Sequence, residues 1–378
     1  MLNRACQALR TYGFGKQRVI PSLDGLRAVS IALVLVAHAD GTRHFATWDI
    51  PLDLGAFGVR MFFVISGYLI TSILLAELRQ KGTISLRRFY FRRTLRLFPA
   101  CYFLIGVTAV LAAAGVVQLA RRDLIFGATY TMDYFDGRGW PLGHLWSLAV
   151  EEQFYLIWPL TLRSLRASRG KKVLLGVLLL APLGRLAWPY VGPAFNFLRW
   201  SDALGTGCLL AAMREELYGM RGYSRLLGSR WFFLVPMAGI GAAWIPFWKI
   251  RMLLGETTAN VAIALSIDWA MRNSKGLVGR FLNQPTVSFI GVLSYSLYLW
   301  QQPFLNRGSE KPYCAFPLNI LLAFTLALVS YVAIEAPFLR LRMALERRRK
   351  KPEAQFEPGA DFAGYRPRRS VRDQSAMS

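Results

Sequence analysis

Arg27 and His38 are the residues whose types and spacing first suggest chemistry. They lie near the two ends of LDGLRAVSIALVLVAHADG, residues 23–41, a segment apolar enough to cross a membrane. Eleven residues of an α-helix make about three turns, so both side chains should lie on one face, about 16 Å apart along the axis. Asp24 lies one turn before Arg27.

Two interpretations of this face remain open. Arg27 could extend to lipid headgroups while His38 caps the helix end. Alternatively, the two residues and Asp24 could line a polar path through a helical bundle, because ionisable residues within a span usually face its interior. Histidine suits such a path, since its neutral ring can accept a proton near pH 7.

Other polar residues also interrupt apolar segments. Ser66 and Gly67 lie in RMFFVISGYLITSILLAEL, where they could serve close helix packing or contact a ligand. Glu151 and Tyr155 lie four residues apart in HLWSLAVEEQFYLIWPL and should share a face, with Glu152 beside them. Carboxylates within a span are costly. They could form a salt bridge with an arginine, or orient and charge a histidine.

A basic segment, SLRRFYFRRTLRLFPACYF, joins the second and third apolar blocks. Arg88, Arg92 and Arg96 form an i, i+4, i+8 row, and Arg93 precedes Arg96 by three residues. The segment could be an interfacial helix on anionic lipid. It could also bind a multiply phosphorylated ligand, because guanidinium groups bind phosphate bidentately. A P-loop nucleotide site is not expected, because the sequence has no glycine-rich phosphate loop.

The elements that must position these residues are membrane-spanning helices, each of about 20 residues. The apolar blocks predict an all-α, polytopic bundle with ten spans. They cover residues 22–41, 57–78, 99–119, 146–165, 173–190, 200–217, 231–248, 257–271, 286–305 and 315–339. Residues 1–340 would form the transmembrane domain. Residues 341–378 would form a basic, disordered cytoplasmic tail because they are charged and rich in Pro and Gly.

Composition and charge support a membrane protein. The 378 residues are 54% hydrophobic and carry 46 Lys and Arg against 22 Asp and Glu. The basic residues lie between apolar blocks rather than in a basic domain, so nucleic acid is not an expected partner, whereas membrane lipids are. Most of them fall in segments that an inside amino terminus would make cytoplasmic, which places both termini in the cytoplasm.

The cysteines and the amino-terminal residues give no sign of a metal site or of a cleavable signal peptide. The four cysteines are about a hundred residues apart, so no zinc or iron–sulfur site is expected, and no other metal site is proposed. The first apolar block has no small-residue cleavage site, so no cleavable signal peptide is expected.

Taken in order, several of these segments resemble the acyltransferase-3 family. They are LDGLRAVSIALVLVAH, FFVISGYLI, RRTLRLFPA, HLWSLAVEEQFYLIWP, SDALGTGCLLA, FIGVLSYSLYLWQQPFL and YVAIEAPF. The resemblance runs from about Pro21 to Leu339. It implies a multi-pass protein of the bacterial inner membrane. Its members are O-acyltransferases that modify surface polysaccharide, lipopolysaccharide and related glycans.

The resemblance also implies roles for individual residues. Cytoplasmic acyl-coenzyme A, most often acetyl-coenzyme A, would be the donor substrate, and no permanently bound cofactor is expected. The implied catalytic residues are His38, Arg27, Glu151 and Glu152, with a glutamate holding the imidazole. The implied donor-binding residues are Arg92, Arg93, Arg96, Ser66 and Gly67. The implied substrate-binding residues are Asp24, Tyr68, Trp146 and Tyr155.

The sequence departs from the family pattern at Gln301, where many members are expected to have histidine after YLW. Glutamine cannot accept a proton, so His38 would carry more of the acid–base chemistry. An esterase-like domain, fused to some members, is not expected, because only the tail follows Leu339.

Two other classes of protein would share some of these features. A proton-coupled transporter would also place polar residues on one helix face, but it would need no cytoplasmic phosphate site. A membrane scaffold would use the basic segments for lipid contacts and would tolerate the loss of His38. The arginine row, the His38 face and the paired glutamates together favour the acyltransferase.

Overall fold

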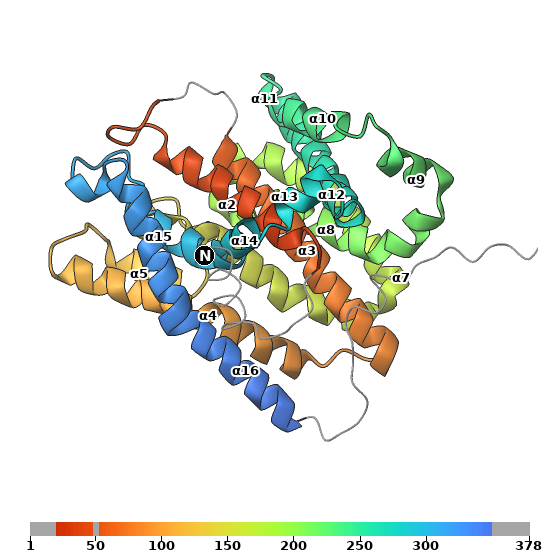
Figure 1. Cartoon of the computed structure of the whole chain (residues 1–378), viewed down its shortest axis with the longest axis horizontal. Coiled ribbons are helices and arrows are strands. Elements are labelled where there is room, and N and C mark those ends of the chain that lie inside the picture. The colour runs from red at the N-terminus through yellow and green to blue at the C-terminus, as the bar shows by residue number, and fades with distance from the viewer. Residues whose placement is uncertain (1–19, 48–52, 350–378) are drawn as a thin grey trace, which may run out of the picture.

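The structure, a computed structural model, describes residues 20–47 and 53–349. In these ranges every regular element is a helix, which confirms the predicted all-α class (Figure 1). The basic amino-terminal segment and most of the predicted tail lie outside the described residues.

Five described helices are long and apolar enough to cross a membrane, and the prediction of ten spans and of cytoplasmic termini stays a prediction. The five are Leu54–Lys81, Leu86–Ala113, Arg169–Ala194, Trp248–Arg272 and Leu318–Arg347.

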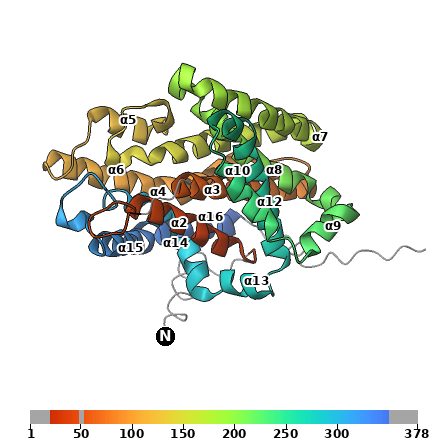
Figure 2. The same ribbon diagram turned by 90° about the horizontal axis from the view of Figure 1, so that it is seen from above.

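The centre of the bundle contains two short helices, α2 (Leu23–Ala39) and α14 (Pro285–Gln301). Helix α14 packs beside α2, which packs in turn against α3 (Leu54–Lys81), and Figure 2 shows α2 and α14 below α3. A Cβ on Gly291 would lie 1.7 Å from the carbonyl oxygen of Asp24. The two backbones are therefore in direct contact, which only glycine permits at this position.

A second close contact joins α3 to α8 (Asn196–Gly219). A Cβ on Gly67 would lie 2.1 Å from the carbonyl oxygen of Leu204, and one on Gly207 would lie 2.0 Å from that of Val64. Each helix thus presents a glycine to the backbone of the other. Gly67, predicted to contact the donor, instead faces α8 at this crossing, as the packing interpretation expected.

Helix α4 (Leu86–Ala113) contains the whole arginine row together with residues 99–113 of the third apolar block. The block was expected to begin at residue 99, but the helix begins 13 residues earlier and continues through Pro99. Gly82, in the left-handed conformation with φ of 68°, ends α3 and allows the short turn into α4. The row is therefore part of a helix that enters the bundle, and not a separate loop.

Helix α7 (Leu145–Val191) reverses direction near its middle. A Cβ on Gly170 would lie 3.3 Å from Cδ1 of Leu162, although eight residues of straight helix would separate them by about 12 Å. The element therefore forms two limbs, consistent with the predicted blocks 146–165 and 173–190.

The last helix is longer than the sequence predicted. Helix α15 (Leu318–Ser330) passes through a π-helical turn, η5 (Tyr331–Glu335), into α16 (Ala336–Arg349). A domain boundary at residue 340 would fall inside α16. Figure 1 shows this long helix running beside α4.

The remaining elements pack around these helices. They are α5 (Arg121–Ala128), η1 (Met132–Tyr134), α6 (Trp140–Gly143), η2 (Gly192–Phe195), α9 (Arg221–Gly228), α10 (Leu234–Ala243), α11 (Trp248–Ile250), η3 (Arg251–Gly255), α12 (Glu256–Arg272), α13 (Leu277–Leu282) and η4 (Pro312–Cys314). The block predicted at 231–248 is mostly the short α10, and the block at 257–271 is the carboxyl-terminal part of a longer helix that starts at Trp248.

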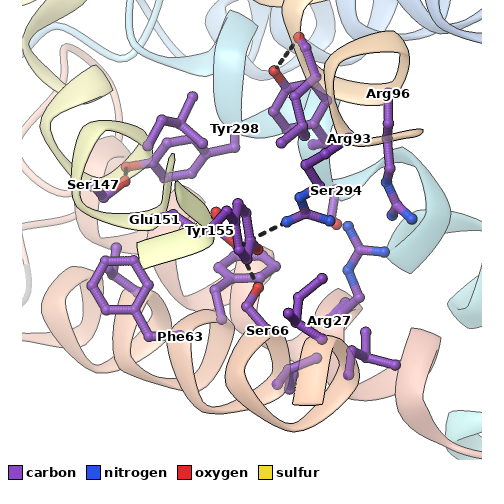
Figure 3. A pocket seen from close by; sticks show the side chains of 18 residues that line it. Arg27, Phe63, Ser66, Arg93, Arg96, Ser147, Glu151, Tyr155, Ser294 and Tyr298 are labelled. Atoms are coloured by element: carbon purple, nitrogen blue, oxygen red, sulfur yellow. Dashed lines mark hydrogen bonds and ion pairs between the residues drawn. The ribbon is translucent and has the colours of Figure 1, made fainter. Parts of the chain in front are cut away.

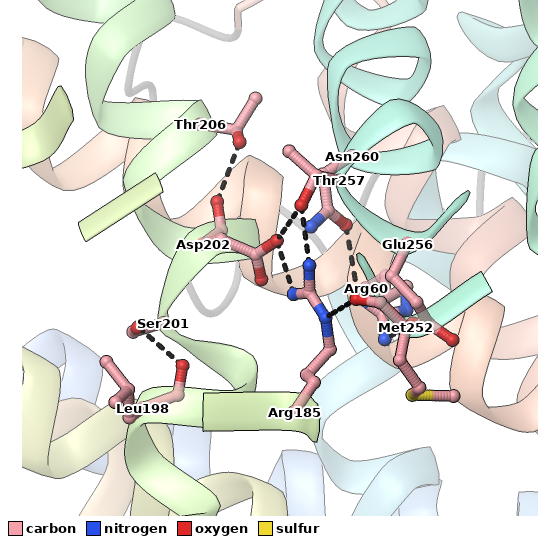
Figure 4. A network of polar contacts seen from close by, with 10 residues as sticks. All are labelled: Arg60, Arg185, Leu198, Ser201, Asp202, Thr206, Met252, Glu256, Thr257 and Asn260. Carbon is pink, nitrogen blue, oxygen red and sulfur yellow. Dashed lines mark hydrogen bonds and ion pairs between the residues drawn. The ribbon is translucent and has the colours of Figure 1, made fainter. Parts of the chain in front are cut away.

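A buried polar network joins α3, α7, α8 and α12 (Figure 4). Arg185 Nη1 lies 2.6 Å from Asp202 Oδ2, and Thr257 Oγ1 donates to the same carboxylate oxygen at 2.9 Å. Arg60 forms an ion pair with Glu256 beside them. Each buried charge has an opposite charge as partner, and removing one member of such a pair typically costs about 3–5 kcal/mol. The network thus fixes the four helices laterally.

The α3–α8 crossing generates a prediction about stability. Gly67→Ala would force the two backbones apart, and overpacking of this kind costs about 1–3 kcal/mol. Gly106→Ala is a matched control, because Gly106 lies on an exposed face of α4 with no atom within 4 Å of its added Cβ. We expect a lower thermal unfolding midpoint in detergent for Gly67→Ala only. Equal midpoints for the two variants would contradict the crossing.

Candidate active site

A cavity lies between α2, α3, α4, α7 and α14. Six of the predicted site residues line it: Arg27, Ser66, Arg93, Arg96, Glu151 and Tyr155. Its other lining residues are Val59, Phe62, Phe63, Ile65, Leu69, Ile70, Leu97, Ser147, Leu148, Ser294, Tyr295 and Tyr298. Residues from five helices, separated by up to 271 positions in the chain, thus meet in one place.

Glu151 organises the middle of the cavity. Ser66 Oγ and the Tyr155 hydroxyl both donate to Oε1 of Glu151, and Arg93 Nη2 lies 3.5 Å from the same oxygen. The Arg93 guanidinium also lies over the Tyr155 ring, 3.6 Å from its centroid. One carboxylate therefore fixes two hydroxyl groups and one cation, and the predicted salt bridge between a glutamate and an arginine is present.

The cavity is polar at one end and largely apolar at the other. Figure 3 shows the guanidinium groups of Arg27, Arg93 and Arg96 gathered on one side, with Phe63 and Tyr298 on the opposite side. Three cations around one space favour a ligand with several negative charges.

Glu335 balances part of this charge and was not singled out from the sequence. It accepts a hydrogen bond from Ser296 and lies within electrostatic range of Arg96 and Arg27. The residue belongs to the YVAIEAPF segment and to the π-helical turn η5. Such turns often occur at functional sites, but the sequence has no pattern that marks one.

Arg92 does not line the cavity. Its Nε lies 2.8 Å from Glu346 Oε1 on α16, so this member of the arginine row connects two helices. Arg93 and Arg96 remain as the α4 cations that reach the cavity.

His38 lies at the other end of α2, beyond the cavity wall. Its ring meets the edge of Trp140 at a centroid distance of 5.8 Å, and it lies beside the Gln301 amide. The charged groups acting on it are Arg307 and Asp53. Glu151 is engaged with Ser66 instead, so the expected contact between Glu151 and the imidazole is not formed in the described chain.

His144 is a second histidine near His38, and the sequence interpretation missed it. Its side chain is buried, at 3% exposure, and it is close enough to His38 for electrostatic interaction. Both ring nitrogens of His144 and both amide atoms of Gln301 lack a well-aligned hydrogen bond among the described residues, although His144 lies near the Leu299 backbone and Gln301 near His38. Buried polar atoms without well-formed hydrogen bonds are costly. The group of His38, His144 and Gln301, the histidine cluster, is therefore suited to a hydroxyl-bearing ligand.

The other predicted residues do not line the cavity. Tyr68 is fully buried and near Arg214, and Trp146 packs on Trp200 with ring centroids 4.9 Å apart. The backbone of Asp24 supports α14 at Gly291, as described above. Glu152 lies within electrostatic range of Arg93, and its Oε1 has no hydrogen-bond partner among the described residues.

The chain belongs to a known family of proteins. Residues 20–338 match the family model described as an acyltransferase domain, so the chain belongs to the acyltransferase-3 family. The resemblance seen in the sequence segments is thereby confirmed.

Two curated relatives are O-acetyltransferases by name. The chain is 32% identical over 368 residues to the O-acetyltransferase OatA of Staphylococcus aureus (strain NCTC 8325 / PS 47), covering 85% of this chain and 57% of the relative. It is 29% identical over 380 residues to the putative O-acetyltransferase SACOL0978 of Staphylococcus aureus (strain COL), covering 87% and 59%. The chain therefore spans less than two thirds of the length of these relatives. No solved structure matches the chain.

Proposed function

We propose that this chain is a membrane O-acetyltransferase. It takes the acyl group from acyl-coenzyme A at the cytoplasmic face. It delivers that group to a hydroxyl of a surface polysaccharide, lipopolysaccharide or other glycan. The observation that carries the proposal is the cavity itself, in which three guanidinium groups lie at one end and the histidine cluster lies beyond the other. The names of the relatives support acetyl as the group transferred.

The arginine end of the cavity is the proposed donor site. Coenzyme A carries several phosphate groups, which Arg27, Arg93 and Arg96 would bind through charged hydrogen bonds. The Glu151 carboxylate limits the freedom of Arg93 and so prepares one guanidinium before the ligand arrives. The thioester would then extend toward Phe63 and Tyr298.

The histidine cluster is the proposed acceptor site. His38 would take the proton of the acceptor hydroxyl as its oxygen attacks the thioester carbonyl carbon. The C–O bond of the ester forms, the C–S bond breaks, and coenzyme A leaves as a thiolate that is then protonated. Arg27, on the same helix face but about 16 Å away, serves the donor end.

The charge distribution gives the proposed orientation. With both termini in the cytoplasm, the basic turn between α3 and α4 faces inside, and the loop between α14 and α15 faces outside. The membrane would be the bacterial inner membrane. In this orientation α2 runs outward, which puts Arg27 toward the cytoplasm and His38 toward the outer face.

Donor binding is tested by comparing arginines on the same helix. Arg93→Ala and Arg96→Ala should each weaken acetyl-coenzyme A binding by about 1.5–3 kcal/mol, the usual value for a lost charged hydrogen bond. Arg92→Ala is the control, because Arg92 pairs with Glu346 outside the cavity. Isothermal titration of purified, folded variants measures the affinities. If Arg93→Ala and Arg96→Ala bind as tightly as the wild type, the cavity is not the donor site.

Transfer is tested by comparing two histidines. His38→Asn should lower glycan O-acetylation about 10²- to 10⁴-fold, as expected for a lost general base, while donor binding survives. His44→Asn should have no effect, because His44 is exposed in a left-handed turn that asparagine tolerates.

The measurement for the two histidine variants is base-labile acetate in surface glycans. Cells lacking the gene would carry each variant at equal membrane abundance. Normal acetylation with His38→Asn would end the catalytic proposal and favour the transporter or scaffold alternatives.

Orientation is tested by labelling single introduced cysteines in intact cells with a membrane-impermeant maleimide. Thr83 and Glu310 are both exposed, in the turn after α3 and the loop after α14. Both cysteines are introduced into a chain in which Cys6 is replaced by Ser. Glu310→Cys should react in intact cells, whereas Thr83→Cys should react only after the cells are broken. The opposite pattern would place the arginine end of the cavity on the wrong side of the membrane.

A further inference from the structure

Three polar residues of α7 form a stripe that connects the donor cavity with the histidine cluster. His144, at the helix start, is followed by Ser147 and Glu151 at intervals of three and four residues. Such intervals place side chains on one helix face. Glu151 and Ser147 line the cavity, whereas His144 belongs to the histidine cluster.

A matching stripe runs along α14. Ser294, Tyr298 and Gln301 follow one another at intervals of four and three residues. Ser294 and Tyr298 line the cavity, and Gln301 lies beside His38. From Ser294 to Gln301 the helix rises about 10 Å, so Tyr298 lies close to midway between the two groups.

The middle members of the two stripes are bonded to each other. Ser147 Oγ lies 2.6 Å from the Tyr298 hydroxyl, which in turn donates to the carbonyl oxygen of His144 at 3.0 Å. The centroid of the Tyr298 ring lies 5.4 Å from that of the His144 ring and 6.4 Å from that of the Phe62 ring. Ser147 and Tyr298 are only 4% and 6% exposed. The pair, labelled in Figure 3, therefore forms the part of the cavity wall that borders His144.

We propose that this pair, Ser147 and Tyr298, determines the size of the acyl group that the protein accepts. The inference rests on the proposed function and adds a specificity determinant to it. The thioester carbonyl must come within reach of a hydroxyl at the histidine cluster, so it must lie at the pair. The atoms beyond the carbonyl then pack against the Tyr298 ring and the neighbouring phenylalanines.

An acetyl group adds one methyl to the carbonyl and fits against an intact pair. A longer chain must displace the Tyr298 ring, which costs the hydrogen bonds to Ser147 and to the His144 carbonyl. The pair thus excludes longer acyl chains and thereby selects short acyl groups.

The test compares binding of acetyl-coenzyme A and butyryl-coenzyme A to the purified full-length protein by isothermal titration. The wild type should prefer acetyl-coenzyme A. Tyr298→Leu and Ser147→Gly should each shift the affinity ratio toward butyryl-coenzyme A by about tenfold or more, the range that methylene groups produce in a fitted pocket. Ser294→Gly is the matched control, since it makes the same change in the same cavity one turn nearer the arginines. Its ratio should stay that of the wild type.

Two serine variants keep the test decisive if Tyr298→Leu fails to fold. An unchanged ratio in folded Ser147→Gly, or an equal shift in Ser294→Gly, overturns the inference while leaving donor binding intact. Failure of the wild type to bind either thioester overturns the proposed function instead.

Discussion

Glu151 is the group on which the geometry of the cavity depends. Its Oε1 receives hydrogen bonds from Ser66 and Tyr155 and attracts Arg93, so one oxygen joins α3, α4 and α7. A carboxylate in this position resolves two problems together. It compensates one of the guanidinium groups that would otherwise repel one another, and it satisfies two hydroxyl groups at the cavity wall. The three arginines still outnumber Glu151 and Glu335, so the charge around the cavity stays positive.

The sequence predicted which of these residues would lie together when they belong to the same helix, because helical periodicity places them on one face. The intervals between Glu151 and Tyr155, and between Arg93 and Arg96, put each pair on a common face, and both pairs line the cavity. The same reasoning could not separate Arg92 from its neighbours, because the side chain's partner, Glu346, is more than 250 residues away in the chain. The apolar blocks predicted the helical class. They did not predict the start of α4, because the arginines between residues 86 and 99 interrupt the apolar pattern although the helix is continuous there.

Residues whose importance depends on tertiary neighbours could not be found from the sequence. His144 stands alone at the start of a helix, and Tyr298 resembles any aromatic residue in an apolar span until Ser147 is seen beside it. The partners of the buried arginines lie on other helices: Arg60 pairs with Glu256 on α12, and Arg185 pairs with Asp202 on α8. A span that carries an isolated charge predicts a partner, but it does not identify which residue that partner is.

The glycine contacts of the bundle have a mechanical consequence. Backbones that touch at Gly291, Gly58 and Gly207 cannot slide past one another without clashing, so α14, α2, α3 and α8 behave as one rigid group. Helix α4 is attached differently, through side chains such as Tyr295, whose hydroxyl donates to the Leu97 carbonyl at 2.7 Å. Arg92 couples it in turn to α16. A displacement of α4 away from this group would widen the cavity, and α16 would have to move with it because Arg92 is paired with Glu346.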